Sequence, residues 1–124
     1  MAQMINTGSS TINGDVQSAP NIPAPSSSQT FINIYEQGTG SAVNQRTVTT
    51  GKTFYLMGVA TSDASTTIEF FDTTPSVMLL TLASGTAGGV VLTSVCPICS
   101  WASGEHVNLK VTNGKEVNFW GFEQ

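Results

Sequence analysis

The sequence predicts an all-β protein, an antiparallel two-sheet sandwich resembling a jelly roll, preceded by an extended N-terminal arm. Short apolar segments recur at about the 8 to 12-residue spacing that is typical of sandwiches and barrels. Serine and threonine supply 14 and 17 of the 124 residues, and these residue types favour turns and pleated surfaces. No stretch shows the 3.6-residue periodicity of a helix. Together these observations favour strands throughout the domain.

The domain is expected to span residues 31–124. We predict strands at 31–35, 45–50, 52–61, 66–71, 77–83, 90–95, 106–112 and 116–122. Asn113-Gly114 separates the last two, and Asn-Gly between alternating segments is the strongest short-range hairpin signal. Eight strands on one antiparallel scaffold indicate a jelly roll or a related two-sheet sandwich.

Residues 1–30 differ in composition from the domain. Asp15 is their only charged residue, prolines cluster near their end, and serine, threonine, asparagine and glycine supply most of the rest. Such a segment has too few apolar side chains to order itself alone, so we expect it to order against a partner. The expected anchors are the isolated apolar residues Met4, Ile5, Ile12, Val16, Ile22 and Pro23. The alternative is an arm that packs on its own domain.

Two of the expected strands are apolar on both faces. Strict alternation puts Phe54, Leu56 and Ala60 on one face and Tyr55, Met57 and Val59 on the other. In the last strand, Val117 and Phe119 oppose Trp120 and Phe122. One face forms the core, and the other predicts an interface unless loops or the arm cover it. We therefore expect a homo-oligomer whose interface includes Tyr55, Met57, Phe71, Trp120 and Phe122.

The charge content limits the classes of partner. Four basic residues face eight acidic ones, which gives a net charge of −4, and only 10% of residues are charged. A nucleic-acid surface needs clustered lysine and arginine, so nucleic acid is not an expected partner. The apolar runs are far shorter than the roughly 20 residues of a membrane-spanning helix. No basic stretch followed by an apolar run precedes Phe31, so we expect neither a secretory signal nor a membrane partner.

The segment 96–109, CPICSWASGEHVNL, contains both cysteines and the only histidine. A redox Cys-x-x-Cys opens a helix, but no helix is predicted after Cys99. In extended chain the two cysteines lie about 10 Å apart, too far for a disulfide unless a tight turn brings them together. Cys96, Cys99 and His106 lack the fourth ligand of a structural zinc site. We interpret the cysteines as ordinary thiols, and predict neither a metal nor a cofactor.

Three further patterns are weak signals of ligand binding or catalysis. Gly51-Lys52-Thr53 resembles the end of a phosphate-binding loop, but Arg46 stands where that loop needs its first glycine. His106 has Glu105 beside it, although neighbouring strand residues face opposite ways and no nucleophile can be tied to the pair. An enzyme is therefore not expected. Trp101, Trp120 and Tyr55 could form a sugar-stacking platform, although such aromatic residues are more often core or interface.

Three segments resemble a known class of proteins: GKTFYLMGVATSDAS (51–65), TIEFFD (67–72) and PICSWASGEHVNLKVTNGKEVNFWGFEQ (97–124). They are similar to small β-sandwich structural proteins of tailed bacteriophages, namely head decoration (cement) proteins and the compact domains of head or tail fibres. The shared features are a Gly-Lys-Thr entry to the first long strand, a Ser-Gly-Glu turn and a final Gly-aromatic-Glu at 121–123. Cys-Pro-Ile-Cys is not part of this pattern.

The resemblance covers about residues 51–124 and implies a virion component, commonly trimeric, without enzymatic activity. It leads to the prediction of a decoration protein on the capsid surface, a homotrimer or another homo-oligomer, with the major capsid protein as its partner. The alternative is a fibre or tail-tip module that recognises host surface glycans.

Overall fold

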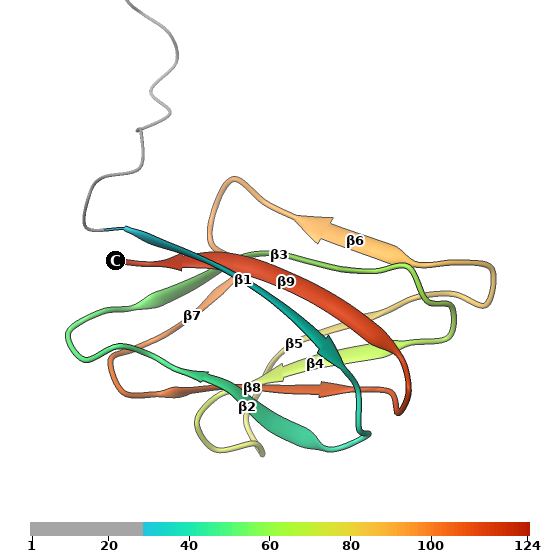
Figure 1. Ribbon diagram of the computed structural model, residues 1–124, viewed down its shortest axis with the longest axis horizontal. Coiled ribbons are helices and arrows are strands. Elements are labelled where there is room, and N and C mark those ends of the chain that lie inside the picture. Colours follow the sequence, from blue (N-terminus) through green and yellow to red (C-terminus); the bar gives the residue numbers. More distant parts are fainter. Residues whose placement is uncertain (1–28) are drawn as a thin grey trace, which may run out of the picture.

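The computed structural model describes residues 29–124, and in this range the chain is an all-β sandwich (Figure 1). The strands are β1 (Thr30–Gln37), β2 (Ala42–Thr47), β3 (Phe54–Thr61), β4 (Thr67–Phe71), β5 (Met78–Ala83), β6 (Val90–Thr93), β7 (Cys99–Trp101), β8 (His106–Val111) and β9 (Glu116–Glu123). The anchors predicted in the arm, Met4 to Pro23, lie outside the described residues.

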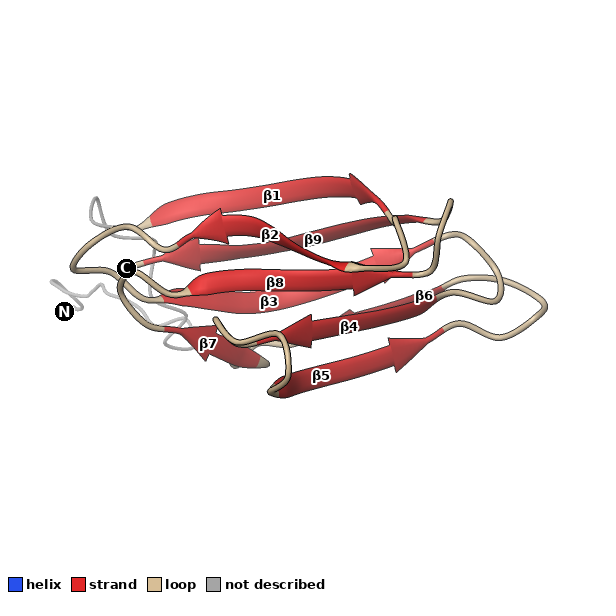
Figure 2. Cartoon of the chain, turned by 90° about the horizontal axis from the view of Figure 1, so that it is seen from below, coloured by secondary structure: helices blue, strands red, loops and turns tan. Residues whose placement is uncertain are grey.

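The strands form two antiparallel sheets. Sheet A has the order β1-β9-β3-β6, and sheet B has the order β2-β8-β4-β5. Strands β6 and β7 pair with successive parts of β3, so together they occupy the place of one strand. Figure 2 looks onto sheet B, with β5 at its outer edge.

This order is that of a jelly roll. The chain changes sheet at nearly every connection, and only β4–β5 and β6–β7 remain within one sheet. The predicted fold class, an antiparallel two-sheet sandwich of the jelly-roll kind, is confirmed.

The predicted hairpin at Asn113-Gly114 is wrong. The turn is present, with Gly114 at a φ of 80°, but β8 belongs to sheet B and β9 to sheet A. Gly114 N donates to Gly38 O at 2.9 Å, and Gly38 N donates to Lys115 O at 2.7 Å. The turn is thus bound to the neighbouring β1–β2 connection, and both connections carry the chain from one sheet to the other. The turn was predicted correctly from its residues, but tertiary packing determines which strands pair.

The alternation predicted along β3 is wrong in its second half. The register of β3 against β9 shifts between Leu56 and Gly58, which marks a β-bulge that reverses the facing of the residues beyond it. Val59 is therefore buried in the core, and Ala60 faces outward. Phe54 and Leu56, before the bulge, are buried as predicted.

Two strand assignments also differ from prediction. The strand expected at 45–50 lies earlier, at Ala42–Thr47, where it pairs with β8. The short strand β7 was not predicted, because three residues carry too little periodicity to be recognised. Strand β1 begins at Thr30, one residue before the predicted domain start.

Aromatic side chains from both sheets fill the centre of the core. Phe119 of sheet A packs against Phe54 of the same sheet and against Phe70 of sheet B, with distances of 6.4 and 5.2 Å between the ring centroids. Trp101 packs against Phe54 at 5.7 Å, and its Nε1 donates to the carbonyl oxygen of Phe71 at 2.9 Å. This bond satisfies the one polar atom of a fully buried indole.

One ion pair joins the two sheets. Glu123, at the end of β9, is only 2% exposed, and its Oε2 accepts a bond from Arg46 Nε of β2 at 2.5 Å. The hydrogen bond from Arg46 holds the pKa of the Glu123 carboxyl below its ordinary value, against the effect of burial. Sequence reasoning treated Arg46 as an isolated cation, because the alignment of β2 with the end of β9 is a product of the fold.

Candidate binding surface

The outer face of sheet A carries a row of aromatic side chains. In register, Phe31 of β1 faces Phe122 of β9, which faces Tyr55 of β3. The ring centroids of Phe31 and Phe122 lie 6.5 Å apart, and those of Phe122 and Tyr55 lie 5.2 Å apart. We call Phe31, Phe122 and Tyr55, with Trp120 beside them, the aromatic row.

Trp120 lies flat on the sheet because its neighbour is a glycine. A Cβ atom at Gly58 would lie 2.1 Å from two ring carbons of Trp120, a distance that real side chains do not adopt. Gly58 faces Trp120 in the register, immediately after the bulge in β3. The glycine therefore makes room for the indole against the backbone of β3.

The aromatic row is accessible and almost free of charge. Phe31 is 67% exposed, and Tyr35, farther along the same face of β1, is 64% exposed. Tyr55, Trp120 and Phe122 are half-buried. Among the strand residues that face outward on sheet A in the described range, Glu116 at the start of β9 is the only charged one. An uncharged aromatic surface of this kind is typical of a binding interface.

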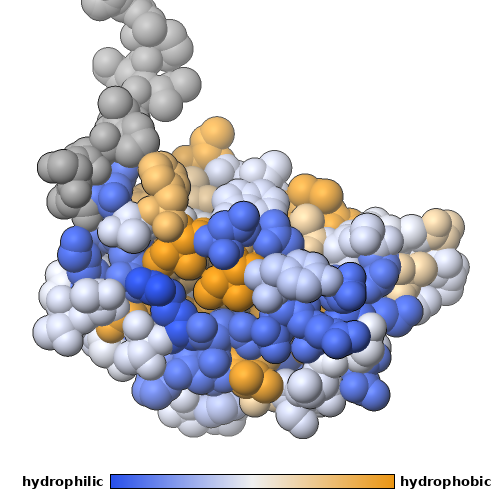
Figure 3. Space-filling view, in the orientation of Figure 1, coloured by the Kyte–Doolittle hydropathy of each residue, from blue (hydrophilic) through white to orange (hydrophobic). Residues whose placement is uncertain are grey.

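The outer face of sheet B is different in kind. Lys110 of β8 and Glu69 of β4 form an ion pair across it, with Nζ and Oε1 3.8 Å apart. Figure 3 shows mostly hydrophilic side chains over the lower part of the molecule, with one hydrophobic group among them, whereas larger hydrophobic groups lie in the middle of the view and along its upper rim. The two faces of the sandwich are thus distinct surfaces.

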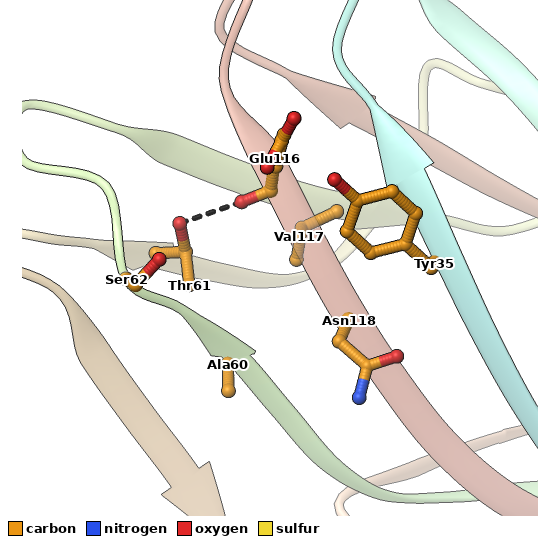
Figure 4. A pocket seen from close by; sticks show the side chains of 7 residues that line it. All are labelled: Tyr35, Ala60, Thr61, Ser62, Glu116, Val117 and Asn118. Carbon is orange, nitrogen blue, oxygen red and sulfur yellow. Dashed lines mark hydrogen bonds between the residues drawn. The ribbon is translucent and has the colours of Figure 1, made fainter.

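A hollow of about 170 Å³ lies at the far end of sheet A from Phe31, beside Tyr35 (Figure 4). Its wall includes Glu116, Asn118 and Thr61, and the Thr61 hydroxyl donates to the Glu116 carbonyl oxygen at 2.6 Å. A hydrogen bond to the Glu116 side chain raises the pKa of Tyr35 above its ordinary value. The hollow combines an aromatic ring, a carboxylate and an amide.

The structure brings together four of the five predicted interface residues. Tyr55, Met57, Trp120 and Phe122 lie on sheet A, where Met57 is the bulge residue. Phe71 lies on sheet B, opposite Asn108 and Met78 in the register, so it does not belong to the same surface. Whether these residues form an interface remains a prediction.

Sequence reasoning missed Phe31 and Tyr35. A signal was present, because FINIY alternates aromatic residues with the isoleucines Ile32 and Ile34, and Ile32 faces the core. The proposed sugar platform is wrong for Trp101, which is fully buried. Trp120 and Tyr55 remain available at the surface.

The cysteines and the histidine do not form one site. Cys96 is exposed, Cys99 is half-buried, and both are free thiols. Burial raises the pKa of Cys99 to about 11, so this thiol stays protonated at neutral pH. Oε1 of Glu105 accepts a bond from Ala102 N at 2.7 Å, and His106, on the outer face of sheet B, is held by its backbone N to Thr73. Within residues 29–124, no three histidine, cysteine or acidic side chains lie close enough together to hold a metal ion.

Comparison with protein-family models finds no match to this chain, and comparisons with curated proteins and with solved structures find no significant similarity. No helix long and apolar enough to cross a membrane occurs in the described part of the chain.

Proposed function

We propose that this chain is a capsid decoration protein of a tailed bacteriophage. It acts on the capsid surface as a homotrimer or another homo-oligomer, and it binds the major capsid protein through the aromatic row. The observation that carries the proposal is an accessible, almost uncharged row of aromatic side chains on one sheet of a jelly roll.

Four considerations support it. Jelly rolls are common among viral capsid domains, and aromatic side chains are enriched in the cores of protein interfaces. The sequence resembles phage structural proteins over about residues 51–124. A decoration protein also needs only modest affinity per contact, because many copies on a lattice reinforce one another when each subunit makes more than one contact.

Copy number provides the first test. Particles encoded by the same genome should be purified and the chain quantified by mass spectrometry against the major capsid protein. A decoration protein should be present in hundreds of copies. A few tens of copies or fewer would assign the chain to a fibre, portal or tail.

The surface is tested by adding purified protein back to particles that lack it. Tyr55→Ser with Phe122→Ser should reduce the bound copies at least tenfold, because the substitutions remove the centre of the aromatic row. Glu69→Gln with Lys110→Gln, on the opposite face, is the matched control and should bind as the native chain does. Equal binding by the two double variants, both shown to be folded by thermal unfolding, would contradict the proposal.

The predicted arm can be tested in the same assay. Deletion of residues 1–29 retains every described strand, and the shortened chain should fold but fail to saturate particles. Saturation equal to that of the full chain would show that this segment is not the tether.

The hollow beside Tyr35 favours glycan recognition as a second candidate function. Aromatic rings stack on sugar faces while carboxylates and amides bind their hydroxyls, and the hollow offers all three. Titration with common hexoses, followed by NMR, should shift the Tyr35 and Asn118 signals if the module binds glycans. Absence of shifts at millimolar sugar would remove this candidate.

A further inference from the structure

One long side of the sandwich is bounded by two edge strands. Within the described range, β5 pairs only with β4, and β6 pairs only with β3. Each therefore presents unpaired backbone donors and acceptors along its free edge. We call this side, formed by β5, β6 and residues 73–77 and 94–98 beside them, the open side.

The open side has no charged side chain from Thr73 onward. Residues 73–104, which include β5, β6 and β7, contain no Asp, Glu, Lys, Arg or His. The edge strands of the other long side do carry charge, since Glu36 lies in β1 and Arg46 in β2. Proteins commonly use charged side chains to prevent edge strands from pairing with other chains. That protection is missing here.

Apolar side chains are exposed along the same side. Met78 is 50% exposed, Val91 is 64% exposed and Val95 is 96% exposed, with Val77 and Leu79 beside them. The inward-facing residues of these strands, Leu80, Leu82 and Leu92, pack on the core but are only partly buried. The hydrophobic core thus continues to the surface at the open side.

We propose that the open side is the contact between two copies of this chain. In the dimer, β5 pairs antiparallel with β5 of the second copy about a two-fold axis, and sheet B continues across the contact. Two-fold symmetry places the same patch against itself, and an antiparallel pair of identical strands satisfies the free backbone groups of both.

The charge distribution selects a second copy as the occupant. Each copy carries a net charge of −4, so most ways of bringing two copies together oppose like charges. A side without charge avoids this penalty in any register. A different protein partner of an acidic chain would be expected to meet complementary charges, and the open side provides none. The inference does not depend on the proposed function, because it concerns the purified chain alone.

The experiment measures the oligomeric state of the full chain by sedimentation velocity across a range from about 1 to 200 μM. The native chain should convert from monomer to dimer within this range. Met78→Lys with Thr81→Lys places two charges on β5 at positions whose side chains are exposed in the single chain. This variant should raise the dissociation constant at least tenfold.

The matched control adds the same two charges to the other long side. Gln37 ends β1 and Thr47 ends β2, and both are exposed on edge strands. Gln37→Lys with Thr47→Lys should dimerise as the native chain does, which separates the position of the charges from their effect on net charge. Thermal unfolding of both variants verifies that each is folded.

Hydrogen exchange of the β5 amides distinguishes the possible occupants. Protection that appears only at dimer-forming concentrations is expected. Protection at every concentration in a monomeric native chain would mean that another part of the same chain covers β5, and would overturn the proposal. A monomer with unprotected β5 at 200 μM, a trimer, or a Met78→Lys/Thr81→Lys variant that dimerises normally would also overturn it. A native chain that dimerises as expected but does not bind particles would contradict the proposed function alone.

Discussion

The outer faces of the two antiparallel sheets differ in their chemistry. Sheet A presents Phe31, Phe122 and Tyr55 in contact across three strands, whereas sheet B presents the Lys110–Glu69 ion pair at the equivalent depth. A sandwich needs only its inner faces to fold. The aromatic side chains on sheet A are therefore more than the core requires, and the proposed function uses them as its binding surface.

The largest expected effect lies where the two sheets are joined. Arg46→Met leaves the Glu123 carboxylate without its cation. Because Glu123 is 2% exposed but Arg46 is 30% exposed, we expect a cost of about 2 to 3 kcal/mol, below that of a fully buried pair. We expect urea denaturation at pH 7 to show a loss of this size in the free energy of unfolding. A loss no larger than that of an exposed pair would show that the sheets are joined by packing alone.

The destabilisation caused by Arg46→Met should depend on pH. The pKa of Glu123 is lowered in the fold, so its contribution is complete above the ordinary glutamate pKa of about 4.3. It is lost as the pH falls through the lowered pKa. The stability gap between the native chain and Arg46→Met should thus narrow below about pH 4, as measured by thermal unfolding across pH.

The next effect tests how Trp120 is held on sheet A. Gly58→Ala places a methyl group inside the indole ring, and we expect a destabilisation of about 1 to 3 kcal/mol. The tryptophan emission should shift to longer wavelength, since Trp101 is buried and Trp120 moves into water.

Gly88→Ala is the control for that substitution, because no atom lies within 4 Å of the added carbon. It should change stability by less than about 1 kcal/mol and leave the emission unchanged. An unshifted spectrum in Gly58→Ala would mean that Trp120 does not lie on β3.

A smaller effect on stability, but a clear effect on the surface, is expected from Phe31→Ser. Phe31 is largely exposed at the margin of the aromatic row, so the free energy of unfolding should change by about 0.5 kcal/mol or less. Fluorescence of a dye that binds exposed apolar surface should fall measurably. Lys110→Ser, on sheet B, should leave the dye signal unchanged, and an equal fall would remove the contrast between the faces.

The smallest effect is expected from Lys110→Met, which breaks the exposed ion pair on sheet B. Exposed pairs contribute about 0 to 1 kcal/mol, and salt screens them. Denaturation at low and high ionic strength should show a difference from the native chain that shrinks with salt. A loss comparable to that of Arg46→Met would contradict the distinction between a surface pair and a buried pair.

Local patterns predicted much of this fold. The alternation in 116–122 correctly placed Val117 and Phe119 in the core and Trp120 and Phe122 outside. The same rule failed after Met57 because of the bulge in the pairing with β9. Gly58 within the strand was the sequence signal for it, since an isolated glycine in a strand often marks a bulge. The Asn113-Gly114 turn was predicted correctly. Whether the two strands that it joins pair with each other depends on contacts with Gly38, far away in sequence.

The candidate surface was predictable only in part, because the sequence shows alternation along a strand but not which strands lie side by side. Tyr55 and Trp120 stood out as apolar residues on the second face of a strand, and the structure places them together. Phe71 could not be separated from them, since sequence alone does not say which sheet a strand joins. Phe31 could be placed only once β1 was known to lie beside β9.

The first and last strands of the chain, β1 and β9, lie side by side, and this affects where a reporter or epitope can be attached. Thr30 pairs with Glu123, and the side chains of Gln29 and Gln124 are joined by a hydrogen bond. A reporter fused after Gln124 emerges at this corner, close to Phe31, and would crowd the face that carries the aromatic row. The connection from β5 to β6 lies at the other end of the molecule (Figure 1), and Gly85 and Gly88 within it have open space around them. An epitope inserted between those glycines would be presented away from that face.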